Sequence, residues 1–259
     1  LSGDGTESDP YEISNVSELQ AMEDDLDANY ELVSDIDASQ TAQFNNGSGF
    51  DPVGPCFNGS LDGDSHTITG LTIDRPDETD VGVFRVAGNG ATLADLTLAN
   101  TTVTGNADVG GIVGRNQGTI THASVSGSVT GTGEFSTVGG LVGFNVGNVT
   151  NARISSNVTG DEYVGGLVGD NRGSIQTATV SGSVNGTRRV GGLIGYNDYG
   201  GTAQNTTIAG NVTGTETVGG VIGFNDAIII ETAASGSVTG SDDVGGVIGF
   251  NSDGGRIQN

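Results

Sequence analysis

The sequence predicts an all-β fold, a β-solenoid of about seven coils. Three observations support this. An eight-residue pattern, Val-Gly-Gly followed by two aliphatic residues and Gly-x-Asn, recurs at intervals of 26 to 29 residues, and Gly, Val, Ser and Thr dominate the composition. Between the copies, apolar residues alternate with hydroxyl residues, as in Ala123 to Gly131, which is typical of half-buried strands. Repeats of this length are typical of solenoids in which each repeat forms one coil. The six full copies begin at Val109, Val138, Val164, Val190, Val218 and Val244, with a weaker copy at Val81.

The chain divides at about residue 60. Residues 1–60 are predicted to form an acidic N-terminal cap with one helix and loops, and residues 61–259 a solenoid that stops within a repeat. Residues 17–20 read as a capping box, which predicts a helix over about 18–27, and residues 30–36 read as a strand. A cap is expected because an open solenoid end exposes unpaired backbone groups. Alternation over residues 61–73 predicts the first coils, with Ile68, Leu71 and Ile73 facing the core.

The repeated pattern also predicts which side each residue faces. The paired glycines, such as Gly139 and Gly140, indicate a corner where φ is positive. After Leu141 the strand alternates, so we expect Val142 and Phe144 to face outward and Asn145 inward. Because Arg115 and Asp170 occupy the Phe144 position in other coils, an outward orientation is favoured there. Stacked coils would then carry an apolar interaction strip that a partner should cover. The strip consists of Val142, Phe144, Ile194, Tyr196, Ile222, Phe224, Ile248 and Phe250.

The last residue of each copy is an asparagine. Stacked at one inner turn, these side chains would form a structural ladder in which neighbouring amides satisfy each other's donors and acceptors. The ladder comprises Asn116, Asn145, Asn171, Asn197, Asn225 and Asn251.

The charge of the chain limits which ligands it can bind and indicates the environment of its source organism. The chain has 32 acidic residues, eight arginines, no lysine and a net charge of −24, and residues 1–108 carry 21 of the acids. Such a charge disfavours binding to nucleic acid or to anionic lipid. An acidic excess without lysine suits very high salt, where charge repulsion is screened, so we expect a halophilic source. The sequence contains no apolar run long enough for a membrane span, and Cys56 has no partner for an intrachain disulfide.

The pattern Val-Gly-Gly-Leu-Val-Gly, followed by a short turn and an Ala-x-Val-Ser-Gly-Ser-Val-x-Gly strand, resembles the GLUG-motif family of secreted and cell-surface repeat proteins. The opening residues, GDGTESDPYEISNVSELQAM, are similar to the segment that precedes such repeats in bacterial and archaeal surface proteins. The resemblance implies a right-handed parallel β-helix, exported and often part of a large adhesin-like protein, here from a halophilic archaeon. GLUG repeats also occur beside the peptidase domain of immunoglobulin A peptidases, but the zinc motif of that enzyme is missing here.

Few residues of the chain are candidates for catalysis. We expect no enzyme activity, no catalytic residues and no metal. The two histidines, His66 and His122, are far apart and cannot form the zinc motif of a metallopeptidase. Carboxylate pairs that could cleave a glycan occur at Asp62 with Asp64, Asp161 with Glu162 and Asp242 with Asp243, but the second and third pairs lie in variable turns. Asp62 and Asp64 could share a calcium ion, although no third ligand is evident.

The chain is rich in the N-glycosylation pattern Asn-x-Ser/Thr. We expect some of these sites to carry glycans. The acceptor residues are Asn15, Asn46, Asn58, Asn100, Asn148, Asn157, Asn185, Asn205 and Asn211.

These observations favour a non-catalytic cell-surface stalk or adhesin component that mediates assembly or attachment. Its expected partners are another protein, or a second copy bound through the apolar strip or a solenoid end, and surface glycans. One alternative is a carbohydrate-binding module in which the aromatic residues of the strip stack on sugar rings. A polysaccharide-cleaving enzyme and an ice-binding surface of Ser and Thr rows are the weaker alternatives.

Overall fold

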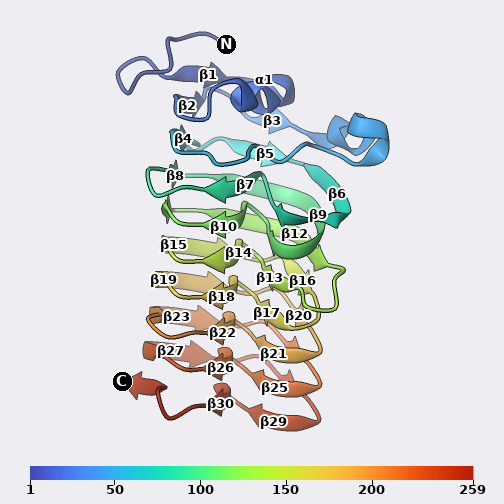
Figure 1. Cartoon of the computed structure of the whole chain (residues 1–259), viewed down its shortest axis with the longest axis vertical. Coiled ribbons are helices and arrows are strands. Elements are labelled where there is room, and N and C mark those ends of the chain that lie inside the picture. Colours follow the sequence, from blue (N-terminus) through green and yellow to red (C-terminus); the bar gives the residue numbers. More distant parts are fainter. Residues whose placement is uncertain (259) are drawn as a thin grey trace.

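The computed structural model describes residues 1–258 and confirms the predicted parallel β-solenoid. Coils stack along one long axis from the N-terminus at one end to the last strands at the other (Figure 1). The strands form one sheet of 24 strands, here the long sheet, and one sheet of seven. All pairings between named strands are parallel, so the same position of each coil repeats above and below itself.

The seven-stranded sheet takes one strand from each predicted coil. Its strands are β7 (Phe84–Ala87), β10 (Val113–Asn116), β14 (Val142–Asn145), β18 (Val168–Asn171), β22 (Ile194–Asn197), β26 (Ile222–Asn225) and β30 (Ile248–Asn251).

The long sheet follows the coil around the other sides. Its strands in the N-terminal half are β1 (Tyr11–Ile13), β2 (Asn29–Leu32), β3 (Ile36–Asp37), β4 (Ser60–Asp62), β5 (Thr67–Thr69), β6 (Thr72–Val81), β8 (Thr92–Ala94), β9 (Thr97–Gly110), β11 (Thr119–Thr121) and β12 (Ser124–Gly131). Those in the C-terminal half are β13 (Thr137–Gly139), β15 (Asn148–Ile154), β16 (Asn157–Thr159), β17 (Tyr163–Gly165), β19 (Ser174–Val180), β20 (Val184–Asn185), β21 (Arg188–Gly191), β23 (Thr202–Ile208), β24 (Val212–Thr213), β25 (Glu216–Gly219), β27 (Ile228–Ala234), β28 (Val238–Thr239), β29 (Asp242–Gly245) and β31 (Arg256–Gln258).

The first 60 residues continue the parallel ladder. Strand β1 pairs with β2, and β2 pairs with β4, so the predicted boundary near residue 60 falls within a run of paired strands. Helix α1 (Val16–Gln20) and the 3₁₀ helices η1 (Ala21–Asp24) and η2 (Ser39–Gly47) lie at this end, where α1 adjoins β1 (Figure 1).

The start of the first helix differs from the prediction. The helix begins at Val16, and Asn15 is its N-cap, because the Asn15 side chain accepts hydrogen bonds from the backbone N–H groups of Ser17 and Glu18. Glu18 in turn accepts from the N–H of Ser14 at 2.7 Å, so a capping interaction exists, displaced from the predicted residues 17–20. Asparagine is at least as good a cap as serine, and here it comes first.

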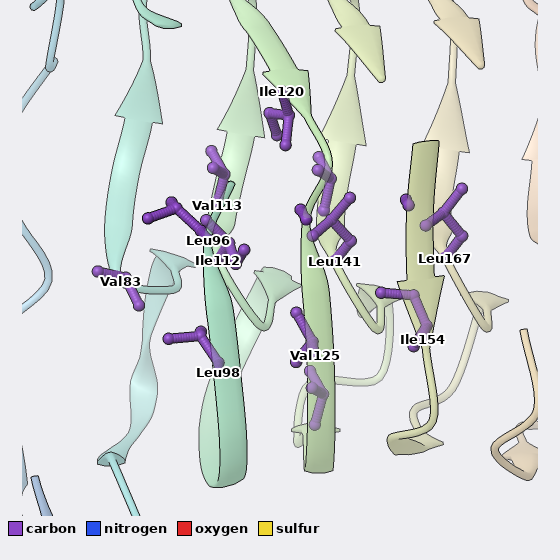
Figure 2. Close-up of a cluster of buried hydrophobic side chains, with 14 of the residues drawn as sticks. Val83, Leu96, Leu98, Ile112, Val113, Ile120, Val125, Leu141, Ile154 and Leu167 are labelled. Carbon is purple, nitrogen blue, oxygen red and sulfur yellow. The ribbon is translucent and has the colours of Figure 1, made fainter. Parts of the chain in front are cut away.

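The interior is a narrow apolar core in which equivalent residues of successive coils stack. Ile112, Leu141 and Leu167 are fully buried, as are the predicted core residues Ile68, Leu71 and Ile73. Figure 2 shows side chains from successive coils gathered in one buried cluster. Because each coil buries its apolar side chains against the next, the stacked coils form a continuous core.

The expected positive φ at the paired glycines was wrong. Neither Gly139 nor Gly140 has a positive φ; Asp108 and Arg189, which precede the Val-Gly-Gly triplet in their coils, do. The glycines are needed for space instead. A Cβ atom on Gly140 would lie 2.3 Å from the carbonyl oxygen of Gly166, and one on Gly195 would lie 2.5 Å from the backbone nitrogen of Val164. At this corner the backbones of successive coils, and those of the two sheets, therefore approach too closely to leave room for a side chain.

Candidate functional site: the asparagine ladder and the aromatic row

The asparagines of the repeat form a continuous hydrogen-bonded row inside the solenoid. The Nδ2 of each residue donates to the Oδ1 of its counterpart one coil further on, from Asn116 to Asn251, at 2.8–2.9 Å. The side chains from Asn116 to Asn225 are fully buried. Most of them also bond to the following turn, as where Asn145 donates to the carbonyl of Gly147 at 3.3 Å. The row thus satisfies buried polar groups and ties each coil to the next.

The aliphatic half of the predicted outer strip was wrong. Val142, Ile194 and Ile222 have no exposed surface and belong to the buried apolar cluster, and Ile248 in the last coil is partly buried. Val142 lies between Val113 and Val168 of the adjacent coils. Alternation along a strand correctly predicts which residues share one side of the strand. It does not predict whether that side is exposed, because other parts of the chain can cover it.

The aromatic half of the strip forms an aromatic row, which we define as Phe144, Tyr196, Phe224 and Phe250. Phe144, Tyr196 and Phe224 are partly buried, and Phe250 in the last coil is exposed. The ring centroids of Tyr196 and Phe224 are 5.3 Å apart, and those of Phe224 and Phe250 are 5.0 Å apart. The rings therefore pack against one another along the solenoid axis.

Arginine side chains from the same chain cover much of this row. The guanidinium groups of Arg115 and Arg172 lie 5.1 and 5.0 Å from the centroid of the Phe144 ring. Arg189 lies 5.8 Å from the Tyr196 ring and 5.6 Å from the Phe224 ring. Cation–π contacts of this kind stabilise the fold and occupy ring faces that a sugar would need. The cover that the sequence led us to expect from a partner is supplied largely by the chain itself.

These arginines are held by acidic residues of their own coil or of a neighbouring coil. Arg115 pairs with Asp108 at 2.6 Å, Arg172 with Asp198 at 2.8 Å, and Arg189 with Glu162 at 2.8 Å. Each guanidinium thus contacts both a carboxylate and an aromatic ring. Because side chains of adjacent coils take part, these contacts link neighbouring coils to one another.

Asp170 lies within the aromatic row, between Phe144 and Tyr196 in the strand register. The residue is only 4% exposed, so the expectation that a charged residue at this position must face solvent was wrong. Its Oδ1 has no hydrogen-bond partner among the described residues, and Oδ2 lies 3.5 Å from Arg172. Burial raises the pKa of Asp170 to about 7, and the nearby Arg172 only partly opposes this shift.

Replacing Asp170 by asparagine should stabilise the protein at pH 8 and have little effect near pH 4. The native pKa lies above the unfolded value of 3.8, so the native state binds more protons than the unfolded state between pH 4 and pH 7. The wild type therefore loses stability as pH rises through this window, whereas the variant does not. One pH unit of pKa displacement corresponds to about 1.4 kcal/mol, so the gain at pH 8 has an upper limit of about 4 kcal/mol.

Denaturant unfolding at both pH values, in constant molar salt, measures this difference. Asp253→Asn is the control, because Asp253 is exposed and its replacement removes the same charge without changing a buried site. An equal effect of Asp170→Asn at pH 4 and pH 8 would contradict the raised pKa.

The carboxylate pairs are engaged in local structure. Asp62 accepts a hydrogen bond from the backbone N–H of Asp64 at 2.9 Å. Asp161 and Glu162 both lie within 3.6 Å of Arg188. Asp242 and Asp243 are exposed in the last coil. Within residues 1–258, no three metal-ligating side chains of the His, Cys, Asp or Glu types come together.

The two histidines lie on separate coils. The Nδ1 of His66 is 3.5 Å from Asp35, and the Nδ1 of His122 is 3.7 Å from Asp95. The two imidazoles therefore take part in separate local contacts.

All nine acceptor asparagines of the N-glycosylation patterns are exposed. Asn157 and Asn211 occupy equivalent places two coils apart, and each accepts a hydrogen bond from a serine of the next coil. None of the ladder asparagines is part of such a pattern. The buried and the exposed asparagines of this chain are therefore distinct sets.

Residues 105–130 match the model of the GLUG motif. One copy of the repeat therefore matches the GLUG motif, and the other copies are similar to it in sequence. The matched residues include the end of the long strand β9, the first full copy of the pattern and the alternating strand that follows it. The matched residues also include Asn116, the first member of the asparagine ladder.

Two relatives each match about half of this chain. Halomucin of Haloquadratum walsbyi is 42% identical over 140 residues, which are 50% of this chain and 2% of halomucin. A protein of Evansella cellulosilytica, named as a candidate Gly-rich membrane protein, is 36% identical over 132 residues, 48% of this chain and 15% of the relative. The chain therefore spans a small part of either relative. Their names indicate surface proteins, and the haloarchaeal relative agrees with the halophilic source that the composition predicts.

One solved structure resembles the whole solenoid. It is the crystal structure of a candidate immunoglobulin A1 protease from Bacteroides ovatus, with a TM-score of 0.65 and 18% identity, covering 99% of this chain and 86% of that one. At this identity the likeness shows the fold alone. No helix within residues 1–258 has the length and apolar character needed to cross a membrane.

The sequence did not reveal the arginine cover or the burial of Asp170. Arg115 and Asp170 occupy the same place in their repeats as Phe144 does in its own, so the sequence already aligns them with the aromatic row. Several of their contacts, however, are with residues 26 to 35 positions away, such as Asp80 for Arg115 and Tyr196 for Asp170. Knowledge of the coil register would have brought these residues together.

Proposed function

We propose that this chain is a rigid, non-catalytic spacer within a large, exported surface protein of a halophilic archaeon. The asparagine ladder is the observation that carries this proposal, because it joins six successive coils by buried hydrogen bonds. In a solenoid each coil contacts only its neighbours, so length grows by about 4.8 Å per coil without a change in cross-section. The small share of halomucin that the chain matches supports a role as one segment of a long protein.

Removing one whole coil tests the spacer. Deletion of residues 164–189 brings Val190 directly after Tyr163 and preserves the pattern. The shortened chain should remain folded and lose about 4.8 Å of its maximum dimension in small-angle X-ray scattering. Deletion of residues 164–176, about half a coil, is the control and should abolish cooperative unfolding. Loss of folding in the whole-coil deletion, or a collapsed particle, would contradict a modular rod.

Association and glycosylation extend this proposal. Assembly with a second copy or with another protein is part of this proposal. Light scattering in molar salt distinguishes a defined oligomer from a monomer. The exposure of all nine acceptor asparagines supports glycosylation, and a peptide map of native protein with every site unmodified would contradict it.

A further inference from the structure

A groove runs along the outer side of the long sheet where each coil bends. His122, Asn151 and Thr177 occupy the bend in three successive coils, and all three have positive φ, between 52° and 58°. The alanines that follow them, Ala123, Ala152 and Ala178, are buried. Above these small side chains lies a cavity of about 320 Å³. We call it the arginine groove, lined by His122, Ser124, Asn151, Arg153, Thr177 and Thr179.

Arg153 differs from most arginines of the chain. Six of the eight arginines are ion-paired with carboxylates. Among residues 1–258, only Arg153 and Arg256 have no carboxylate within 4.0 Å. In a chain with a net charge of −24, an exposed guanidinium without an acidic partner is unusual. Its planar fork of N–H donors matches the two oxygens of a carboxylate.

Besides Arg153, the polar groups of the groove are an imidazole, an amide and hydroxyls. The Nε2 of His122 lies 3.1 Å from the Nδ2 of Asn151, and its Nδ1 lies 3.2 Å from the hydroxyl of Thr121. These contacts hold the ring at one end of the groove. In the strand register Ser124, Arg153 and Thr179 are neighbours, so a hydroxyl lies on either side of the guanidinium. Hydroxyls both donate and accept hydrogen bonds, which suits a ligand that carries many hydroxyl groups.

We propose that the arginine groove binds a uronate unit of an acidic polysaccharide. Arg153 would pair with the sugar carboxylate, while Ser124, Thr179 and Asn151 would bond to ring hydroxyls. The cavity volume is at the lower end of the range for small-ligand pockets, about 300–1,000 Å³, which suits a short stretch of glycan rather than a large ligand. Bidentate hydrogen bonds are less sensitive to salt than long-range attraction, so binding should persist in molar salt. This inference does not depend on the spacer function.

Titration with trigalacturonate in molar potassium chloride tests the proposal. In the ¹⁵N-labelled chain, the side-chain Nε–H signal of Arg153 and the ring signals of His122 should shift and saturate. The fully methyl-esterified trisaccharide lacks the charge and should bind at least about tenfold more weakly, since a charge-assisted bidentate contact is lost. Acetate, which has the carboxylate without the sugar, should also bind about tenfold or more weakly.

Arg153→Gln should reduce the affinity for trigalacturonate by about tenfold or more with an unchanged circular dichroism spectrum. Arg256→Gln is the matched control, because Arg256 is also without an acidic partner but lines a different cavity, with Tyr199 and Asp226. An equal loss of affinity in the two variants would mean that the trisaccharide is attracted to any arginine without an acidic partner, and would overturn the proposed site. Absence of saturable shifts, or equal binding of the ester or of acetate, would also overturn it.

Discussion

Replacing Gly192 by alanine is expected to destabilise the solenoid by about 3 kcal/mol or more, the upper end of the cost of overpacking in a packed core. A Cβ atom at this position would lie 2.3 Å from the carbonyl oxygen of Gly220 in the next coil and 2.7 Å from the Cγ2 of Ile208. The first of these atoms belongs to the backbone, so no rotamer change can relieve the contact. The strands on either side would have to separate, which would weaken the parallel pairing between the two coils.

Gly246→Ala provides a control at the same place in the pattern. Gly246 is the equivalent glycine of the last coil, and a Cβ there would meet nothing within 4 Å. Alanine at a conformationally compatible site is neutral or stabilises by up to about 1 kcal/mol. Denaturant unfolding in molar salt, followed by circular dichroism, gives both values. If the Gly192→Ala variant is insoluble, a Gly246→Ala variant that stays soluble and unfolds cooperatively still shows that the two positions differ in their tolerance of a Cβ atom. Similar midpoints for the two variants would contradict the steric argument.

Replacing Asn171 by alanine is expected to cost about 2–4 kcal/mol, because it leaves two buried polar groups without their ladder partners. The Nδ2 of Asn145 loses its acceptor at 2.9 Å, and the Oδ1 of Asn197 loses its donor at 2.9 Å. All three side chains are fully buried, so water cannot readily replace the lost bonds. The effect should therefore be greater than that of removing a typical exposed hydrogen bond.

Asn251→Ala is the corresponding control at the end of the ladder. Asn251 accepts from Asn225 at 2.8 Å, but it is itself exposed, so solvent can take its place. We expect a loss below about 1 kcal/mol for this variant. Unfolding curves that show equal losses for Asn171→Ala and Asn251→Ala would mean that burial of the ladder does not matter. The slope of the unfolding transition should be compared as well, since repeat arrays can lose cooperativity.

Much of the architecture could be predicted from the sequence. The recurring pattern from Val109 to Val244 predicts the coil, and the alternation over residues 123–131 predicts a strand whose Val125 and Val129 are buried, as they are. These features depend on the local period of apolar residues and on the identity of equivalent residues in successive coils. In a parallel solenoid equivalent residues stack, so a repeated residue has itself as a neighbour. For the same reason, the repetition of one asparagine was enough to predict the ladder.

What the sequence alone determined is thus the coil, its repeat length and the side of the strand on which each residue lies. The tertiary structure decided which of those sides is exposed. Val142 was expected in solvent and is buried, and Asp170 is enclosed within the aromatic row. Arg189 reaches across to rings of neighbouring coils, and the first helix is capped by Asn15 instead of Ser17. Exposure depends on contacts between residues about one coil apart in the sequence, and a local pattern of alternation contains no information about those contacts.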